Sequence, residues 1–351
     1  MLDFEAGSNI DYRKIGEEMR FRELARPGDG YETGTLNKIT DLEGIRVGHY
    51  TLTEDKPRCL RTGISVIRIP SVYERPVPAA SSVFNGYGKS MGLIQIEELG
   101  TIETDIFLTN TLSIGAVHQG AVRLALESNA ELSSLNVVVM ECNDGYLNEI
   151  RALAIKEEMV ADAVGNAKRD FQLGSCGAGT GMVCFGYKGG IGSSSRIIEF
   201  GGRKYTLGVL VLSNFGKSSD LRIPSMELRP KLQDSDREKG SLIMILGTDL
   251  PLMPHQLKRV TRHMNLAIGI LGAPGHHGSG DISLAFTTSR EYSLSEQSFM
   301  NEGNTISEIF GAAVWACAEA IVDSMLSSDS MTGFKGSVES LRSALISGPR
   351  N

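Results

Sequence analysis

Seven short apolar runs constrain the fold of this chain more than any other feature of its sequence. Each is four to six residues long and rich in β-branched side chains, which is typical of β-strands, and several lack polar alternation, which indicates burial on both faces. The runs are 64–69, 106–109, 137–140, 182–185, 207–212, 242–246 and 282–287. The sequence therefore predicts at least one sheet that is covered on both sides.

Three longer segments follow helical spacing. In 254–271 the apolar positions include Leu257, Val260 and Met264, in steps of three and four that place them on one helix face. The segment 304–326 has the same spacing, and 114–132 is rich in alanine and less strictly patterned. Because strands and helices come in mixed order, we expect an α/β or α+β layered fold and not an all-β sandwich.

The length of 351 residues is compatible with one large layered domain or with two smaller ones. Residues 1–34 are interpreted as an N-terminal arm, because a charged stretch that could form a short helix is followed by the helix-breaking sequence Arg-Pro-Gly-Asp-Gly at 26–30. The remainder, 35–351, is predicted to be one compact domain.

Composition excludes several classes of function. The formal net charge is -7, with 35 Lys and Arg against 42 Asp and Glu, so no basic field for nucleic acid is expected. No apolar run is expected to reach the 18 to 20 residues that span a bilayer, and Met1 to Arg26 is charged where a signal peptide would be apolar. We therefore expect a cytoplasmic protein that binds neither membranes nor nucleic acid.

Glycine-rich and metal-binding motifs are incomplete. Gly88-Lys89-Ser90 resembles the end of a phosphate-binding loop, but Val83 stands where its first glycine belongs, and 177–181 leads into a strand and not into a helix. The five cysteines include no C-x-x-C pair, and no H-E-x-x-H is present. We expect no cofactor and no metal.

The sharpest change in composition lies at Gly240-Ser241. Eleven of the residues in 217–240 are charged, which is typical of a solvated loop, and 241–246 then reads as a buried strand. If the bond before Ser241 were cut, its new α-amine, with a pKa of about 7.7 to 8.0, could act as base for the hydroxyl of the same residue. Gly-Ser alone more often marks an ordinary turn between a loop and a strand. The choice between this interpretation and a cleavage site therefore depends on other residues.

Three further polar residues stand at predicted strand ends. Ser279 and Asp281 follow a glycine- and proline-rich loop and could relay protons to Ser241 or orient its amine. Asn214 ends the run 207–212 and could donate its amide to a developing oxyanion. Each alone is more often turn chemistry, but together they supply the groups of an acyl-transfer site.

Several motifs resemble one known family of enzymes. They run from about residue 23 to about 326, and they are Asn85-Gly86-Tyr87-Gly88, Leu108-Thr109-Asn110-Thr111, Glu141-Cys142-Asn143-Asp144-Gly145, Gly186 to Gly192, Ser213-Asn214-Phe215-Gly216, Gly240-Ser241 and Gly278-Ser279-Gly280-Asp281. In this order they resemble the DmpA (L-aminopeptidase/D-esterase) and β-peptidyl aminopeptidase family, peptidase family S58.

The resemblance implies a four-layer αββα sandwich of the N-terminal-nucleophile type, made as a precursor that cuts itself at Gly240-Ser241 into chains 1–240 and 241–351. Ser241 would form an acyl-enzyme with the N-terminal residue of a small peptide, amide or ester. By position Ser279 and Asp281 are implied as supporting groups. The family's enzymes need no metal and assemble as homo-oligomers, commonly of four cleaved protomers.

The resemblance also implies that Asn214 is an oxyanion donor. Some members have an aromatic hydroxyl as a second donor, where Asn143 stands here, with Tyr146 as the alternative. Two other interpretations stay open: an acyltransferase of the related ornithine acetyltransferase-like architecture, whose second chain usually begins with Thr, and a catalytically silent protein that kept the fold.

Overall fold

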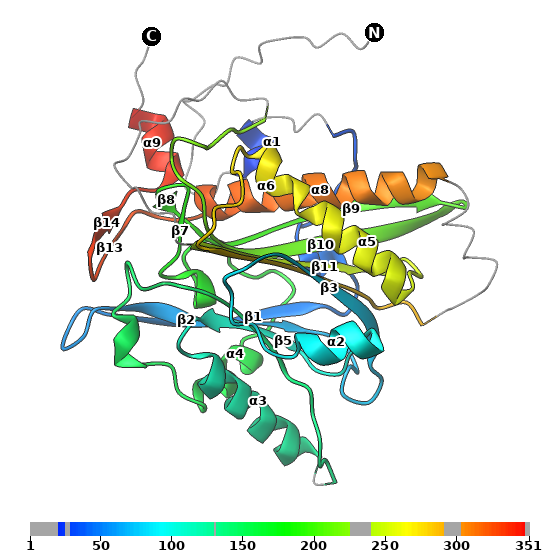
Figure 1. Ribbon diagram of the computed structural model, residues 1–351, viewed down its shortest axis with the longest axis horizontal. Coiled ribbons are helices and arrows are strands. Elements are labelled where there is room, and N and C mark those ends of the chain that lie inside the picture. The colour runs from blue at the N-terminus through cyan, green and yellow to red at the C-terminus, as the bar shows by residue number, and fades with distance from the viewer. Residues whose placement is uncertain (1–19, 25–28, 130, 225–239, 291–302, 348–351) are drawn as a thin grey trace.

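Two β-sheets lie face to face between two layers of helices in the computed structural model (Figure 1). The structure describes residues 20–24, 29–129, 131–224, 240–290 and 303–347. Part of the charged loop predicted at 217–240 and most of the N-terminal arm fall outside these ranges.

The larger sheet has the strand order β4-β3-β12-β11-β10-β9. Its central strands β11 and β12 are parallel, and each of its other neighbouring pairs is antiparallel. The strands are β3 (Val77–Gly86), β4 (Thr101–Ile102), β9 (Gly190–Phe200), β10 (Arg203–Asn214), β11 (Gly240–Thr248) and β12 (Ser279–Thr287). Three of the predicted apolar runs form its centre, in β10, β11 and β12.

The smaller sheet has the order β1-β2-β5-β6 and packs on the inner face of the larger one. Its strands are β1 (Arg46–Glu54), β2 (Leu60–Arg68), β5 (Ile106–Asn110) and β6 (Val138–Cys142). Alternate side chains of both sheets fill the space between them. This inner core includes Ile67, Leu108, Met140, Leu210, Ile243 and Leu284, all buried.

Helices cover both outer faces and complete the predicted four layers. On the larger sheet lie α5 (Pro254–Met264), α6 (Leu266–Ile270) and α8 (Gly303–Leu326), and on the smaller sheet lie α3 (Ile114–Ser128) and α4 (Met159–Gly165). Apolar side chains fill each boundary, so the fold has three cores in parallel planes. The αββα expectation is confirmed.

The remaining elements are short. They are the helices α1 (Phe21–Leu24), α2 (Leu93–Leu99) and α9 (Leu341–Ser347), the 3-10 turns η2 (Ile39–Asp41), η3 (Ile150–Ala152) and η4 (Gly177–Gly179), and two hairpins, β7 (Val183–Cys184) with β8 (Tyr187–Lys188) and β13 (Met331–Gly333) with β14 (Gly336–Val338).

Two details of the sequence-based expectations were wrong. The segment 254–271 forms two helices, α5 and α6, with Asn265 between them. The side-chain oxygen of Asn265 accepts a hydrogen bond from the hydroxyl of Ser283 at 2.8 Å. The stretch Thr305–Leu326 of α8 is long and apolar enough to cross a membrane by length and composition, although no such stretch was expected. Since 89% of its most apolar window is buried against the rest of the fold, α8 is a core helix.

Candidate active site

Three strand ends of the larger sheet bring the predicted catalytic residues to one edge. β11 begins at Gly240, and Ser241 is paired with Asn214 at the end of antiparallel β10. On its other side β11 runs parallel to β12, so that Gly240 pairs with Ser279 and Ser241 with Gly280. Because two parallel strands begin where an antiparallel strand ends, segments far apart in sequence become neighbours.

The hydroxyl of Ser241 lies against the peptide group that precedes it. Its Oγ donates to the carbonyl oxygen of Gly240 at 2.6 Å. A side chain at position 240 has no room, since an added Cβ would lie 2.3 Å from the carbonyl oxygen of Asn214. Close packing therefore requires the glycine, and the hydroxyl and the carbonyl of the Gly-Ser junction are held in direct contact.

Ser279 and Asp281 form a buried pair beside this junction. The hydroxyl of Ser279 donates to Oδ1 of Asp281 at 2.6 Å, while Oδ2 of Asp281 is buried and has no hydrogen-bond partner among the described residues. Burial raises the pKa of Asp281 to about 6, and the bond from Ser279 opposes this shift. The carboxyl group thus keeps one unused acceptor in a protected place, which is the group that a nearby amine would need.

Replacing Asp281 by Asn should stabilise the fold at neutral pH. The folded-state pKa of about 6 lies above the ordinary 3.8, so between about pH 4 and 6 the folded protein holds a proton that the unfolded chain has lost, and stability falls as pH rises through this window. In the Ser241→Ala background, where the chain is continuous and no α-amine is formed, we expect Asp281→Asn to raise the free energy of unfolding at pH 7 by about 2 to 3 kcal/mol. Near pH 4 the variant and its parent should be equal. Denaturant titrations at both pH values measure this, and a destabilised variant at pH 7 would contradict it.

Asn214 and Asn143 are joined directly. Nδ2 of Asn214 donates to the backbone carbonyl of Asn143 at 2.9 Å, and Oδ1 of Asn214 accepts the backbone N–H of Val183 at 2.8 Å. The amide orientation of Asn214 is therefore fixed from both ends, with one N–H left over. Asn143 is exposed, and its own Oδ1 accepts the N–H of Gly145 at 3.0 Å within a tight turn.

Tyr146 lies against the β13–β14 hairpin. Its backbone carbonyl accepts the N–H of Lys335 at 3.0 Å, and its hydroxyl is next to Gly336, where an added Cβ would be 2.6 Å from it. Tyr146 and Asn143 therefore belong to the same turn but contact different elements.

Glu141 is a site residue that sequence reasoning did not select. It is buried near the end of β6, where its carboxylate accepts the backbone N–H of Lys89 at 2.9 Å and the hydroxyl of Thr111. Gly88 and Gly280 lie between Glu141 and the Gly240-Ser241 junction. An added Cβ on Gly88 would lie 3.8 Å from Oε1 of Glu141. An added Cβ on Gly280 would lie 2.7 Å from the nitrogen of Gly88 and 3.0 Å from Oγ of Ser241. The signal in the sequence was an acidic residue directly after the apolar run 137–140.

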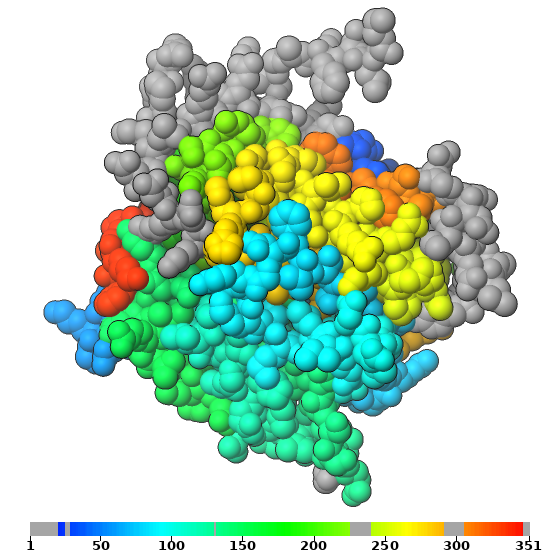
Figure 2. Space-filling view, in the orientation of Figure 1, coloured from blue at the N-terminus to red at the C-terminus, as the bar shows by residue number. Residues whose placement is uncertain are grey.

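The rim of the site is formed by the end of β3 and the loop before β12. The side-chain amide of Asn85 donates to the carbonyl of His276 at 2.6 Å, and the ring of Tyr87 lies 6.3 Å from that of His277. These segments lie next to each other on the surface in Figure 2, in cyan and gold. Nε2 of the His276 ring lies 2.8 Å from Oδ2 of Asp220, at hydrogen-bond distance. Among the described residues, no group of three His, Cys, Asp or Glu is placed to hold a metal.

Comparison with known proteins places the chain in a family. The model of peptidase family S58 matches residues 37–339. The chain belongs to peptidase family S58. A curated relative, the β-peptidyl aminopeptidase BapA of Sphingosinicella xenopeptidilytica, is 33% identical over 90% of this chain and 86% of its own length.

Solved structures of similar proteins agree with this S58 membership. The PH0078 protein of Pyrococcus horikoshii OT3 is 41% identical with a TM-score of 0.80, covering 90% of this chain and 94% of its own. A β-aminopeptidase of a Burkholderia species is 33% identical with a TM-score of 0.83, covering 93% and 97%. The L-aminopeptidase D-Ala-esterase/amidase of Ochrobactrum anthropi, described as a variant of the Ntn hydrolase fold, is 35% identical with a TM-score of 0.81, covering 90% and 94%.

As an S58 member the chain is a hydrolase with aminopeptidase function. The family, the fold and the enzyme class expected from the sequence are confirmed. The nucleophile, the cutting of the chain and the roles of the single residues are separate questions.

Proposed function

We propose that the chain is a self-processing N-terminal serine aminopeptidase. One observation carries this proposal: the hydroxyl of Ser241 donates to the carbonyl oxygen of Gly240 at 2.6 Å, at a strand end beside the unpaired oxygen of Asp281. In the precursor, Oγ attacks the carbonyl carbon of Gly240, and the C–N bond breaks as the acyl group moves to oxygen. Water then cleaves the ester, which leaves a carboxylate on Gly240 and a free α-amine on Ser241.

The new amine serves as the base in turnover. Its ordinary pKa of about 7.7 to 8.0 leaves a useful neutral fraction near pH 7, so it can take the proton of its own hydroxyl as Oγ attacks the substrate carbonyl. The same proton passes to the leaving amine or alcohol, and water hydrolyses the acyl-enzyme. Oδ2 of Asp281, which has no hydrogen-bond partner among the described residues, is proposed to accept an N–H of this amine, while Ser279 donates to Oδ1.

Asn214 is the first oxyanion donor in this mechanism, because its Nδ2 has one N–H left beyond its bond to Asn143. We assign the second donation to the side-chain amide of Asn143, at the position that the family resemblance implies, while the backbone carbonyl of Asn143 accepts from Asn214. Tyr146 is the alternative on the same turn. Comparing Asn143→Ala with Tyr146→Phe distinguishes the two residues. Substitution of the true donor should lower kcat by a factor of about 10² or more, and substitution of the other residue should change kcat little.

Glu141 is proposed to bind the substrate's α-ammonium. An aminopeptidase must recognise a free N-terminus, and the buried carboxylate of Glu141, separated from Ser241 by the closely packed Gly88 and Gly280, provides the matching charge. Glu141→Gln should raise KM for free-amine substrates about tenfold or more. Cutting at Gly240 should be unaffected, because no ammonium is bound in that reaction.

The exposed Glu127→Gln is the matched control and should change neither quantity. Measured KM values and intact masses give both readouts. An unchanged KM in Glu141→Gln would remove the residue from this role.

Hydrolysis of L-, D- and β-residue amides, each offered free and N-acetylated, tests the activity. Free-amine substrates should be cleaved and acetylated ones should not. Repeating the assay with an added amine acceptor tests the acyltransferase alternative, for which the acyl group would pass to the acceptor in place of water. An intact chain that cleaves none of the amides would favour the catalytically silent alternative.

We also propose a cytoplasmic homo-oligomer of four cleaved protomers. Support comes from α2, where Ile94 is 90% and Leu99 is 62% exposed in the single chain, with exposed Met91 beside them. Light scattering of the purified protein should give a mass near four times 37.9 kDa. A monomer by that measurement would exclude the assembly.

A further inference from the structure

Lys188 is buried in a way that the proposed mechanism does not use. Among the described residues it is the only lysine in the buried class. Its Nζ donates to the carbonyl oxygens of Gly179 at 3.1 Å and Gly189 at 2.6 Å, and no carboxylate of the described chain lies within ion-pair distance of it. A charged amine is costly to bury in a protein interior, and burial lowers the pKa of Lys188 to about 7.

The two carbonyl groups stand at the two ends of the β7–β8 hairpin. Gly179 is in η4, just before β7, and Gly189 directly follows β8. A backbone bond from Gly189 N to Met182 O at 3.0 Å closes the same loop. The buried amine of Lys188 thus joins the entry and the exit of the hairpin.

This hairpin holds the oxyanion donor. The backbone N–H of Val183 in β7 donates to Oδ1 of Asn214, and Phe185 N donates to Phe215 O at 2.7 Å. Val183 is the direct strand partner of Lys188. The position of one N–H, and with it the orientation of the Asn214 amide, therefore depends on a hairpin that Lys188 closes.

The other side of the hairpin leaves no room for adjustment. An added Cβ on Gly189 would lie 2.5 Å from the carbonyl oxygen of Ser213 and 2.8 Å from Cβ of Cys184. A hairpin packed this tightly against the end of β10 transmits a change in its own shape to Asn214, because close-packed backbones cannot absorb it locally.

We infer that Lys188 is a positioning residue for the oxyanion donor Asn214, acting through the N–H of Val183. This inference rests on the proposed function, because it gives Asn214 the role assigned there. Lys188 does not contact the reacting atoms. Its removal should leave the chain folded and let the Asn214 amide turn away from the direction in which the oxyanion forms.

A double-mutant cycle tests this coupling. Lys188→Met keeps an unbranched apolar side chain as far as Cε and removes the amine, Asn214→Ala removes the donor, and the third protein carries both changes. We expect Lys188→Met to lower kcat about tenfold or more with KM within about twofold, and Asn214→Ala to lower kcat about 10². In the Asn214→Ala background, Lys188→Met should cost less than about twofold, because the group it positions is already gone.

Lys38→Met is the matched control. Lys38 also donates its amine to a backbone carbonyl, that of Phe171 at 2.6 Å, but it does so near η2 and has no contact with the hairpin. This variant should keep the wild-type kcat. If Lys188→Met does not fold, Lys188→Gln, which keeps an amide donor for one carbonyl, provides the same comparison.

The outcomes are distinguishable. Equal factors for Lys188→Met in the two backgrounds, or an unchanged kcat in the single variant, would overturn the inference while leaving the proposed function intact. A wild-type protein that is uncut and inactive, or an Asn214→Ala variant with full activity, would instead contradict the proposed function.

Discussion

Ser241→Ala should yield a single uncut chain with no measurable aminopeptidase activity. The substitution removes the hydroxyl that donates to the Gly240 carbonyl at 2.6 Å, so the attack that breaks the backbone cannot begin. Without the cut, no α-amine is formed at position 241, and the nucleophile and its base are lost together. Turnover should fall by at least about 10⁴, the scale of losing a catalytic serine. Denaturing mass measurement and an amide hydrolysis assay on the same preparation provide both readouts.

The control for this variant is Ser128→Ala, which removes an exposed hydroxyl at the end of α3. It should be cut and active like wild type. A Ser241→Ala protein that keeps its activity would show that another residue is the nucleophile. One that is still cut at Gly240 but inactive would separate processing from turnover and contradict a shared serine.

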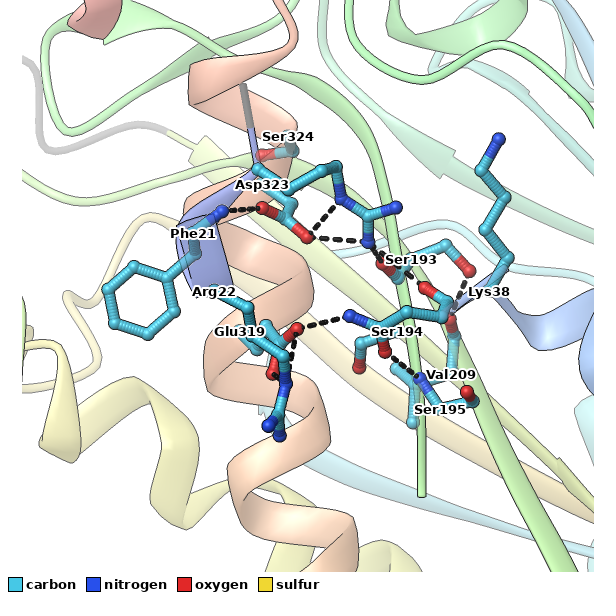
Figure 3. Close-up of polar contacts among 12 residues, drawn as sticks. Phe21, Arg22, Lys38, Ser193, Ser194, Ser195, Val209, Glu319, Asp323 and Ser324 are labelled. Carbon is cyan, nitrogen blue, oxygen red and sulfur yellow. Dashed lines mark hydrogen bonds and ion pairs between the residues drawn. The ribbon is translucent and has the colours of Figure 1, made fainter. Parts of the chain in front are cut away.

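The second large effect is expected in a buried ion cluster that ties the N-terminal segment to α8. Glu319 of α8 accepts from Arg22 Nε at 2.9 Å, from Arg196 of β9 at 2.8 Å and from the amide of Asn37. Arg196 is fully buried and also pairs with Asp29 at 2.6 Å. Figure 3 shows Glu319 on α8 with Arg22 and the β9 serines beside it. The cluster thus connects residues on both sides of position 240.

Glu319→Gln should lower the free energy of unfolding by about 3 to 5 kcal/mol. Breaking a buried ion pair from one side leaves an uncompensated positive charge, because Arg22 and Arg196 would then share Asp29 as their one carboxylate partner among the described residues. Denaturant unfolding in the Ser241→Ala background measures this on a continuous chain. The exposed Glu127→Gln should stay within about 0.5 kcal/mol of its parent. A loss of less than about 1 kcal/mol in Glu319→Gln would show that the cluster adds little to stability.

The central strands were predictable because their runs of apolar residues need no partner to be recognised. The start of β11 at Gly240-Ser241 was predictable from composition, since the charged stretch of sequence 217–240 is followed directly by the apolar run 241–246. β9 was missed because its buried face is polar. Ser193 and Ser194 are fully buried and donate to the carbonyls of Val209 and Ala316, at 2.6 and 2.7 Å.

The site residues likewise divide into those that the sequence predicted and those that it did not. The apolar runs placed Ser279 and Asn214 at strand ends, and the structure pairs these ends with the start of β11, an order of strands that the runs alone do not give. Glu141 was missed, since its approach to the site depends on the close packing of Gly88 and Gly280, which pair segments about 190 residues apart. From the sequence, Lys188 was recognised only as part of a motif. Burial of its amine depends on the β7–β8 hairpin, whose two-residue strands are too short to show a periodic pattern in the sequence.

The most direct test of the mechanism is the denaturing mass of the purified wild-type protein, together with the N-terminal sequence of any smaller fragment. We predict two species, residues 1–240 and 241–351, with the second beginning Ser-Leu-Ile-Met. A single 37.9 kDa chain with full aminopeptidase activity would contradict the account, because Ser241 would then have no α-amine to act as its base.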